Sequence, residues 1–219
     1  MEPDHQPEKL ELFYTPDTCA LASLIACFEA GLEPVLHPVS FAREEQKRPE
    51  YLAINPKGRV PALKVGAEIL TETPAILAFL AHIAPHAALA PTDPLGFARV
   101  QAFNSYLCST VHVAHAHRMR GHRWVDGETH EEAMRRKVPE AMRACYAYIE
   151  DHAFVGPFVF GDAFTISDGY LFTLAQWMEA DGVDPDRFPH LKAHRERIGQ
   201  RAAVRRALGI EHGLMQNPD

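Results

Sequence analysis

Residues 10–31 read LELFYTPDTCALASLIACFEAG, and this stretch decides the fold of the first part of the chain. It opens with a short apolar and aromatic segment, which is typical of a buried strand. A turn follows, and its last residue, Thr18, is a favourable N-cap. Apolar residues then recur at helical spacing up to Gly31, where the helix is expected to end. Cys19 is therefore expected in the first turn of a helix that comes directly after a strand.

The place of Cys19 predicts a reactive thiol. Unpaired backbone N–H groups and the positive end of the helix dipole favour the thiolate at a helix start. The alternative is a small buried cysteine that happens to lie near a cap. Cys27 lies two turns further along the same helix between apolar neighbours, and we expect it to be inert.

The composition sets limits on the function. The chain of 219 residues is long enough for one large or two modest domains, and its 47% hydrophobic and 23% charged residues are ordinary for a globular protein. A net charge of −7 argues against nucleic acid as a partner. No apolar run approaches a membrane span, so no membrane partner is expected. Four cysteines with apolar neighbours favour reduced thiols and a cytoplasmic location.

The segment after the first helix predicts a mixed sheet. Residues 33–41 read as a strand, and Pro38 within it favours a sheet edge. Residues 60–65 and 68–71 read as a hairpin around a Gly-Ala turn. Thr73 is then expected as the N-cap of a helix with Pro74 at its first position. Strands and helices in this order indicate helices packed on a four-stranded sheet.

The chain is expected to divide into two domains. Residues 1–83 form the sheet domain, and residues 84–94 hold three prolines and no periodicity, which indicates a linker. Only helical patterns follow, so residues 95–219 are expected to form an all-helical domain, and the fold class is α+β. One apolar stripe joins Phe97, Val100, Phe103, Leu107 and Val111. A later helix is expected to open with a capping box, with Thr165 as N-cap and Asp168 at N3.

Four motifs carry a resemblance to a known family. They read LFYTPDTCALAS from residue 12, YLAINPKGRVPAL from residue 51, LTETPAI from residue 70 and GDAFTISDGYLF from residue 161. In this order they resemble the bacterial, cysteine-bearing (beta-class) branch of the glutathione transferases over nearly the whole chain. The resemblance implies a thioredoxin-like N-terminal domain, an all-α helical-bundle domain, glutathione as co-substrate and a homodimer.

The resemblance also implies a glutathione site in the first domain. A cis peptide bond before Pro61 would present the backbone of Val60 for pairing with the cysteinyl part of glutathione. Thr73, at a helix start, would bind the γ-glutamyl carboxylate, and Glu72 would meet the α-ammonium group. Cys19 would lie beside the glutathione sulfur.

The stretch FNSYLCSTVHV, from residue 103, resembles the family segment that places a histidine over the active site. His112 is the catalytic counterpart here, and its alternative is a surface or core histidine on a long helix. Ser105 stands at a glutathione-binding position where the family has an asparagine, and Val113 stands where it has a lysine. The family's lysine for the glycine carboxylate has no clear match, and Arg43 or Lys47 could replace it.

Tyr14 and a group of histidines are further candidates. Other branches of the family use a tyrosine near the end of the first strand, so Tyr14 either packs there or offers its hydroxyl. His112, His115 and His122 fall on one helical face together with Met119. Their spacing permits a metal, but no cysteine or carboxylate completes the set on that face, and no metal is expected.

The sequence therefore predicts a glutathione transferase that joins the glutathione thiolate to apolar electrophiles, an activity of detoxification. Disulfide exchange through Cys19 is a second possible chemistry, and it would use one thiol because no cysteine lies three residues away. The alternative from another class is a non-catalytic glutathione-binding interaction module on the same fold. A module without catalytic activity would not need to keep Cys19, Val60-Pro61 and Glu72-Thr73, so the presence of this set counts against it.

Overall fold

The computed structural model describes residues 9–213. Within them the chain forms two compact units. The first, called the sheet unit, consists of residues 9–89 and 202–213. The second, called the helical unit, consists of residues 90–201. Each unit has a buried apolar core of its own.

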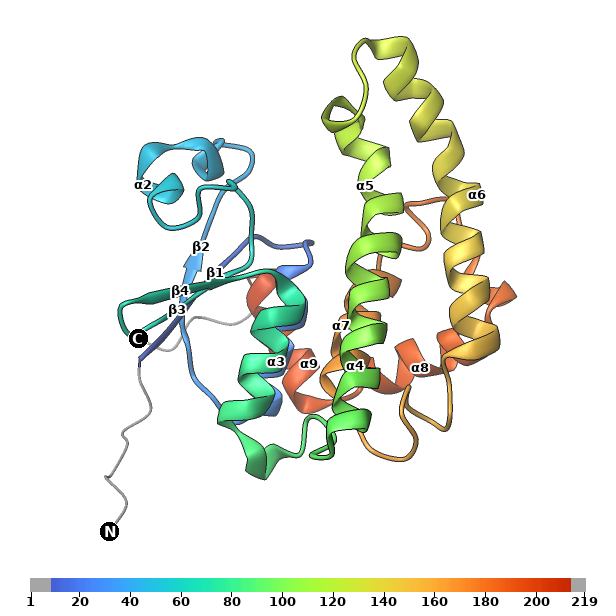
Figure 1. Ribbon diagram of the computed structural model, residues 1–219. Coiled ribbons are helices and arrows are strands. Elements are labelled where there is room, and N and C mark those ends of the chain that lie inside the picture. The colour runs from blue at the N-terminus through green and yellow to red at the C-terminus, as the bar shows by residue number, and fades with distance from the viewer. Residues whose placement is uncertain (1–8, 214–219) are drawn as a thin grey trace. The chain divides into compact units, whose positions relative to one another are not determined.

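A four-stranded mixed sheet forms the centre of the sheet unit (Figure 1). Its strands are β1 (Leu10–Tyr14), β2 (Val35–Pro38), β3 (Ala62–Val65) and β4 (Glu68–Thr71), in the order β2-β1-β3-β4. β1 pairs in parallel with β2 and antiparallel with β3, and β3 pairs antiparallel with β4. This arrangement confirms the predicted mixed sheet, with the proline-containing strand at its edge.

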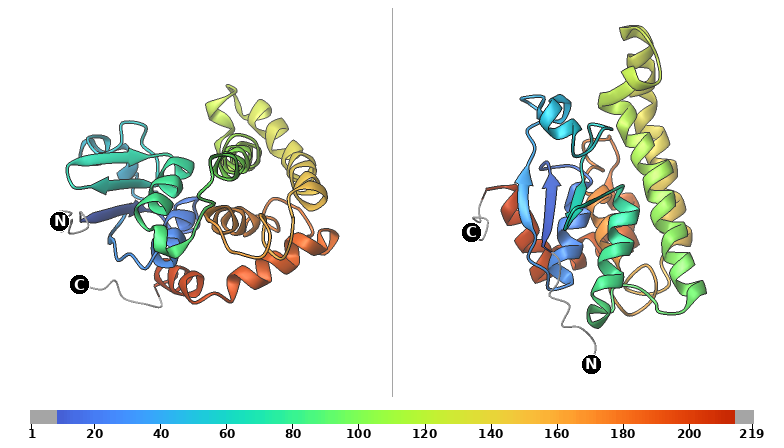
Figure 2. Two further views of the ribbon diagram at one scale, coloured as in Figure 1. Left: turned by 60° about the horizontal axis from the view of Figure 1, so that its bottom comes forward. Right: turned by 60° about the vertical axis from the view of Figure 1, so that its left-hand side comes forward.

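The helices of the sheet unit are α1 (Ala20–Glu29), α2 (Pro49–Leu52), α3 (Thr73–Ile83) and α9 (Ala202–Glu211), with the 3₁₀ turns η1 (Glu45–Lys47) and η2 (Pro85–Ala87). α1 packs against β1, α3 and α9 (Figure 2). Residues 20–27 are therefore all buried. The sequence pattern places the last helix with the helical domain, whereas α9 belongs to the sheet unit. Its partner α1 is distant in sequence, and no local pattern reveals such a contact.

The helical unit contains α4 (Pro94–Tyr106), α5 (His112–Arg120), α6 (Glu128–His152), α7 (Ile166–Ala175) and α8 (Pro189–Gly199), with the 3₁₀ turns η4 (Gly121–Arg123) and η5 (Pro185–Arg187). The π-helical turn η3 (Leu107–Val111) joins α4 and α5 into one long rod, and α6 runs beside α5 (Figures 1 and 2). None of the helices formed by residues 9–213 is both long enough and apolar enough to cross a membrane.

The buried face of this rod differs from the predicted stripe. The buried positions are Val100, Asn104, Leu107 and Val111, whereas Phe97 and Phe103 are half-buried. Asn104 takes a core position because its side-chain oxygen accepts a hydrogen bond from the Ser167 hydroxyl at 2.9 Å. The buried positions are four, three and four residues apart, which is the ordinary helical period, so the prediction differs because a buried polar residue, Asn104, takes the place expected for Phe103.

The capping box predicted at the start of α7 is confirmed. Asp168 accepts hydrogen bonds from the Thr165 backbone N–H at 2.8 Å and from the Thr165 hydroxyl at 2.9 Å. The same carboxylate also accepts from the Val159 N–H at 2.8 Å and from His194 Nε2 at 2.9 Å. Asp168 therefore fixes a loop and a second helix as well as its own helix start.

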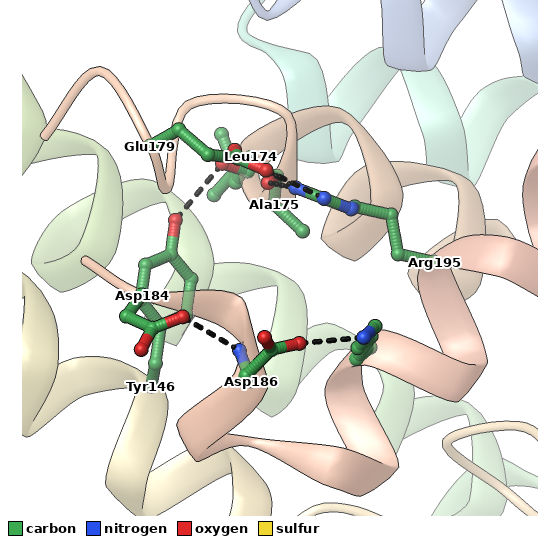
Figure 3. A network of polar contacts seen from close by, with 8 residues as sticks. Tyr146, Leu174, Ala175, Glu179, Asp184, Asp186 and Arg195 are labelled. Atoms are coloured by element: carbon green, nitrogen blue, oxygen red, sulfur yellow. Dashed lines mark hydrogen bonds and ion pairs between the residues drawn. The ribbon is translucent and has the colours of Figure 1, made fainter. Parts of the chain in front are cut away.

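Polar contacts also tie α6, α7 and α8 together (Figure 3). The Tyr146 hydroxyl on α6 donates to the Leu174 carbonyl on α7 at 2.9 Å. Arg195 on α8 donates to the Ala175 carbonyl at 3.0 Å and pairs with Glu179 at 2.6 Å. Tyr146 is fully buried, and burial raises the pKa of its hydroxyl well above the usual value, so it stays a neutral donor.

Candidate functional site

The turn between β1 and α1 is held by its two threonines. The Thr15 hydroxyl donates to the Val39 carbonyl at 2.7 Å, and the Thr18 hydroxyl donates to the Thr15 carbonyl at 2.7 Å. The Thr18 oxygen also accepts the Ala20 N–H at 3.3 Å. Cys19 directly precedes α1 as its N-cap, one residue after the predicted Thr18, but Thr18 accepts the capping hydrogen bond from the Ala20 N–H, whereas Cys19 makes none with its side chain.

Cys19 lies against the backbone that leads into β3. Its side chain is buried, with 8% of its surface exposed, and its Sγ lies 3.6 Å from the Val60 carbonyl oxygen as a hydrogen-bond donor. The peptide bond between Val60 and Pro61 is cis, as the family resemblance implies. The structure thus brings Cys19, Val60 and Pro61 together within the sheet unit.

Polar side chains fix the loop before Val60. The Tyr51 hydroxyl and the Asn55 side-chain amide both donate to the Arg59 carbonyl, each at 2.7 Å. Gly58 has a φ of +60°, and a Cβ there would lie 2.9 Å from the Gln46 carbonyl oxygen. Glycine is required at this point of the loop by both the backbone conformation and the close approach.

Glu72 and Thr73 form the start of α3. Glu72 is the N-cap with a φ of 74°, and Thr73 and Pro74 occupy the first two helical positions. The expected N-cap, Thr73, was therefore wrong by one residue, because Glu72 has the non-helical backbone angles of the N-cap and Thr73 is already helical. Thr73 is buried, and Glu72 is exposed and pairs with Lys57 Nζ at 2.5 Å. Lys57 also donates to the Thr71 hydroxyl at 2.7 Å.

The two cations considered for the glycine carboxylate already have carboxylate neighbours. Arg43 Nε lies 3.3 Å from Glu45, and Lys47 Nζ lies 2.5 Å from Glu44. All of these contacts are local and at the surface, where ion pairs exchange readily with solvent. Both cations can therefore turn to a ligand at little cost.

Tyr14 ends β1 directly before the turn. Its side chain is buried, and burial, followed by the charge of Glu211, raises the pKa of its hydroxyl. Tyr14 is therefore a neutral phenol at neutral pH. Glu211 belongs to α9, and no feature of the sequence indicates that it lies near this turn.

Two predicted site residues belong to the helical unit. His112 is the first residue of α5, directly after the π-helical turn, and its ring lies 5.2 Å from the Trp177 ring. Ser105 is exposed on α4, and its carbonyl accepts the Ser109 hydroxyl at 2.8 Å. The π-helical turn sets the direction of His112 relative to α4.

A carboxylate that sequence reasoning missed lies beside the histidines of α5. His115 stacks on Trp177 with ring centroids 4.0 Å apart, and its Nδ1 lies 2.8 Å from a carboxylate oxygen of Asp181. Arg118 Nε lies 3.1 Å from the same fully buried carboxylate. Residues 9–213 nevertheless contain no group of three or more His, Cys, Asp or Glu side chains placed to hold a metal ion.

Both halves of the chain match known domains. Residues 18–83 match the family model described as glutathione S-transferase, N-terminal domain. Residues 118–197 match the family model described as glutathione S-transferase, C-terminal domain.

Individual relatives cover nearly the whole chain. Glutathione S-transferase GstA of Escherichia coli O157:H7 is 29% identical, with 92% of this chain and 98% of the relative covered. Maleylacetoacetate isomerase of Pseudomonas aeruginosa is 31% identical, with 96% of this chain and 98% of the relative covered. The solved structure of a glutathione transferase homologue from Sulfitobacter with bound glutathione is 44% identical, with a TM-score of 0.90 and 94% and 99% of the two chains covered. Together with the two domain matches, these similarities show that the chain belongs to the glutathione S-transferase family.

Proposed function

We propose that this protein binds glutathione in its sheet unit and transfers the glutathione thiolate to an apolar electrophile. The observation that carries the proposal is the contact between the Cys19 sulfur and the Val60 carbonyl. It joins the thiol at the start of α1 to the backbone that the family resemblance assigns to the cysteinyl part of glutathione. The bound glutathione in the Sulfitobacter relative supports the same ligand.

Glutathione would occupy the edge of the site formed by Val60 and the start of α3. Its cysteinyl N–H would pair with the Val60 carbonyl, which brings the ligand sulfur next to Cys19. The γ-glutamyl carboxylate would meet the unpaired N–H groups of the first turn of α3 and the Thr73 hydroxyl. The α-ammonium group would pair with Glu72, where it must share the carboxylate with Lys57.

Two reactions are possible in this site. In conjugation the glutathione thiol releases its proton to solvent, and its sulfur attacks an electrophilic carbon. A sulfur–carbon bond forms as the leaving group departs with the electron pair of its own bond. The positive end of the α1 dipole would stabilise the thiolate before the attack.

In exchange, the Cys19 thiolate attacks a disulfide between glutathione and a second thiol. A Cys19–glutathione disulfide forms, and the second thiol leaves with the electron pair of the broken bond. A free glutathione thiolate then attacks this disulfide, and oxidised glutathione leaves while Cys19 regains its thiolate.

We propose roles for His112 and Ser105 on the strength of the family resemblance alone. His112 would act on the reacting sulfur, and its packing against Trp177 restricts the orientations of its ring. Ser105 would contribute to glutathione binding, and its exposed position supports this because a ligand can reach it.

A second candidate function is glutathione-dependent isomerisation of a maleyl double bond. The 31% identity with the Pseudomonas aeruginosa maleylacetoacetate isomerase favours it. The glutathione thiolate would add to the double bond, the resulting single bond would rotate, and the thiolate would leave again. Glutathione binding would be the same as in conjugation.

Three measurements distinguish these functions. Retention on immobilised glutathione tests the site, release of halide from an aromatic halide tests conjugation, and conversion of maleylacetoacetate tests isomerisation. We expect retention and halide release. Retention without either activity would favour a binding module, and a protein that does not bind glutathione would contradict the whole proposal.

Glutathione affinity is expected to depend on the start of α3. Thr73→Ala removes a buried hydroxyl and Glu72→Ala removes the partner of the α-ammonium group, so the dissociation constant should rise about tenfold in each. Titration calorimetry measures this change, and circular dichroism checks that the fold is intact. Glu68→Ala, an exposed carboxylate on the neighbouring strand β4, is the matched control. Unchanged affinity in both site variants would remove this helix start from the glutathione site.

We also propose a homodimer, as the family resemblance implies. Large apolar side chains on the helical unit support it, since Leu95 on α4 is 62% exposed and Tyr148 on α6 is 51% exposed. Light scattering should give twice the mass of one chain at micromolar concentration. A mass of one chain under these conditions would contradict the dimer.

A further inference from the structure

We propose that Glu211, at the end of α9, is a positioning residue that holds the turn carrying Cys19. The inference rests on the proposed function, because it assumes that Cys19 acts on glutathione. It adds a residue from the other end of the chain to the support of the site.

Glu211 reaches the turn because α9 packs along α1. Its side chain is buried, with 8% of its surface exposed, and its Oε2 accepts the backbone N–H of Asp17 at 3.4 Å. Its Oε1 is also buried and has no hydrogen-bond partner within residues 9–213. The carboxylate is thus directed at the segment two residues before Cys19.

The turn needs this contact. Asp17 has a φ of +59°, a left-handed conformation that is unfavourable for a residue other than glycine. Thr15 and Thr18 fix the turn through their hydroxyls on either side of Asp17. Glu211 fixes the remaining residue, since its Oε2 accepts the Asp17 N–H.

The burial of the Glu211 carboxyl lowers the free energy of unfolding where that group is ionised. Burial, and to a lesser extent the charge of Asp17, raise the pKa of its carboxyl to about 7, although the Asp17 N–H lowers it. The titratable groups near it include Asp17 in the turn and Tyr14 on β1, and the first turn of α1 contains no acidic residue.

Glu211 releases its proton at a different pH in the folded and in the unfolded protein. An unfolded glutamate releases its proton near pH 4.5, whereas folded Glu211 keeps it up to about pH 7. The folded protein therefore holds more protons in this interval, and the contribution of Glu211 to the free energy of unfolding falls as pH rises. A buried carboxyl that lowers stability at pH 8 and contacts the turn before Cys19 fits a functional role better than a structural one.

The other end of α9 provides a matched control. Arg206 pairs with Glu33 at 2.5 Å and covers the Phe28 ring at 4.1 Å, so it fixes α9 to the far end of α1. Arg206→Ala should weaken the packing of α9 without changing the turn. Glu211→Ala removes the contact to the turn, Glu211→Asp withdraws the carboxylate by one methylene group, and Glu211→Gln keeps an oxygen that can accept the Asp17 N–H.

The test uses the full chain at pH 8 with three measurements: the glutathione dissociation constant, the rate at which oxidised glutathione modifies Cys19, and urea unfolding. We expect Glu211→Ala and Glu211→Asp to bind glutathione about tenfold more weakly and to be modified about tenfold more slowly. Glu211→Gln should stay within about twofold of wild type in both. Glu211→Ala should be no less stable than wild type, whereas Arg206→Ala should be less stable with both glutathione measurements unchanged.

The outcomes separate the two proposals. If wild type does not bind glutathione, the proposed function fails. If wild type binds and Glu211→Ala and Glu211→Asp match it, the positioning role fails while the function stands. A parallel loss of binding and stability in Glu211→Ala and Arg206→Ala would also overturn the role, because it would show a helix-packing effect. Should Glu211→Ala not fold, the contrast between the Asp and Gln variants decides.

Discussion

Replacing Cys19 by alanine is expected to abolish disulfide exchange, with a loss on the order of a hundredfold or more, because the proposed nucleophile is removed. Mass spectrometry should show one glutathione added to wild type after treatment with oxidised glutathione, and no adduct in Cys19→Ala. Conjugation in the same variant separates the two chemistries. Surviving conjugation would make Cys19 an exchange nucleophile, and loss of both activities would mean that Cys19 positions the glutathione sulfur.

Cys27 is the internal control for this experiment. It lies on the same helix, but it is fully buried, and burial followed by the charge of Glu33 raises the pKa of its thiol to about 12. Almost no Cys27 thiolate exists at neutral pH, so alkylation should label Cys19 first, and bound glutathione should protect Cys19. The central role of Cys19 is wrong if Cys27 reacts as fast, or if Cys19→Ala matches wild type in both activities.

Asp168→Ala is expected to cause the largest loss of stability, about 3–5 kcal/mol of the free energy of unfolding. The carboxylate accepts four hydrogen bonds in a site with no exposed surface, and its removal leaves buried donors on Val159, Thr165 and His194 without a partner. Urea unfolding followed by circular dichroism measures the change. Asp168→Asn should lose less, because one oxygen remains to accept a hydrogen bond.

Asp186→Ala is the matched control on the same unit. Asp186 pairs with Lys192 Nζ at 2.5 Å, but its side chain is 73% exposed. Water replaces the lost contact at such a position, so the unfolding curve should hardly move. Equal stability losses in the two variants would show that burial of the Asp168 network is not what stabilises the helical unit.

Much of the fold could be predicted because its signals are local. The strand, turn and helix around Cys19 and the hairpin of β3 and β4 follow from periodicity and turn residues within short windows. Both helix starts of the site are shifted by one residue from the predicted N-caps, since Cys19 directly precedes α1 and Glu72 directly precedes α3. Such shifts depend on side-chain hydrogen bonds that a sequence pattern does not resolve.

The candidate site could be predicted only where its residues are close in sequence to a motif. The cis bond before Pro61 and its neighbour Cys19 follow from the family resemblance, and the structure brings the two segments together. Lys57 on Glu72 and Asp181 beside His115 were missed, because both contacts join residues from different elements. The buried Asn104 was missed for a related reason, since its partner Ser167 belongs to another helix.

The return of α9 to the sheet unit also bears on how the protein is synthesised. The contact between Asp17 and Glu211 spans 194 residues, which a ribosome needs about 10 to 40 s to add at roughly 5–20 residues per second. During that time α1 has left the ribosome without the helix that covers it, and its apolar surface is open to chaperones and to other nascent chains. The sheet unit, whose synthesis begins first, is thus completed last. Cleavage of the chain at a single position cannot release this unit intact, because its two segments flank the helical unit in the sequence.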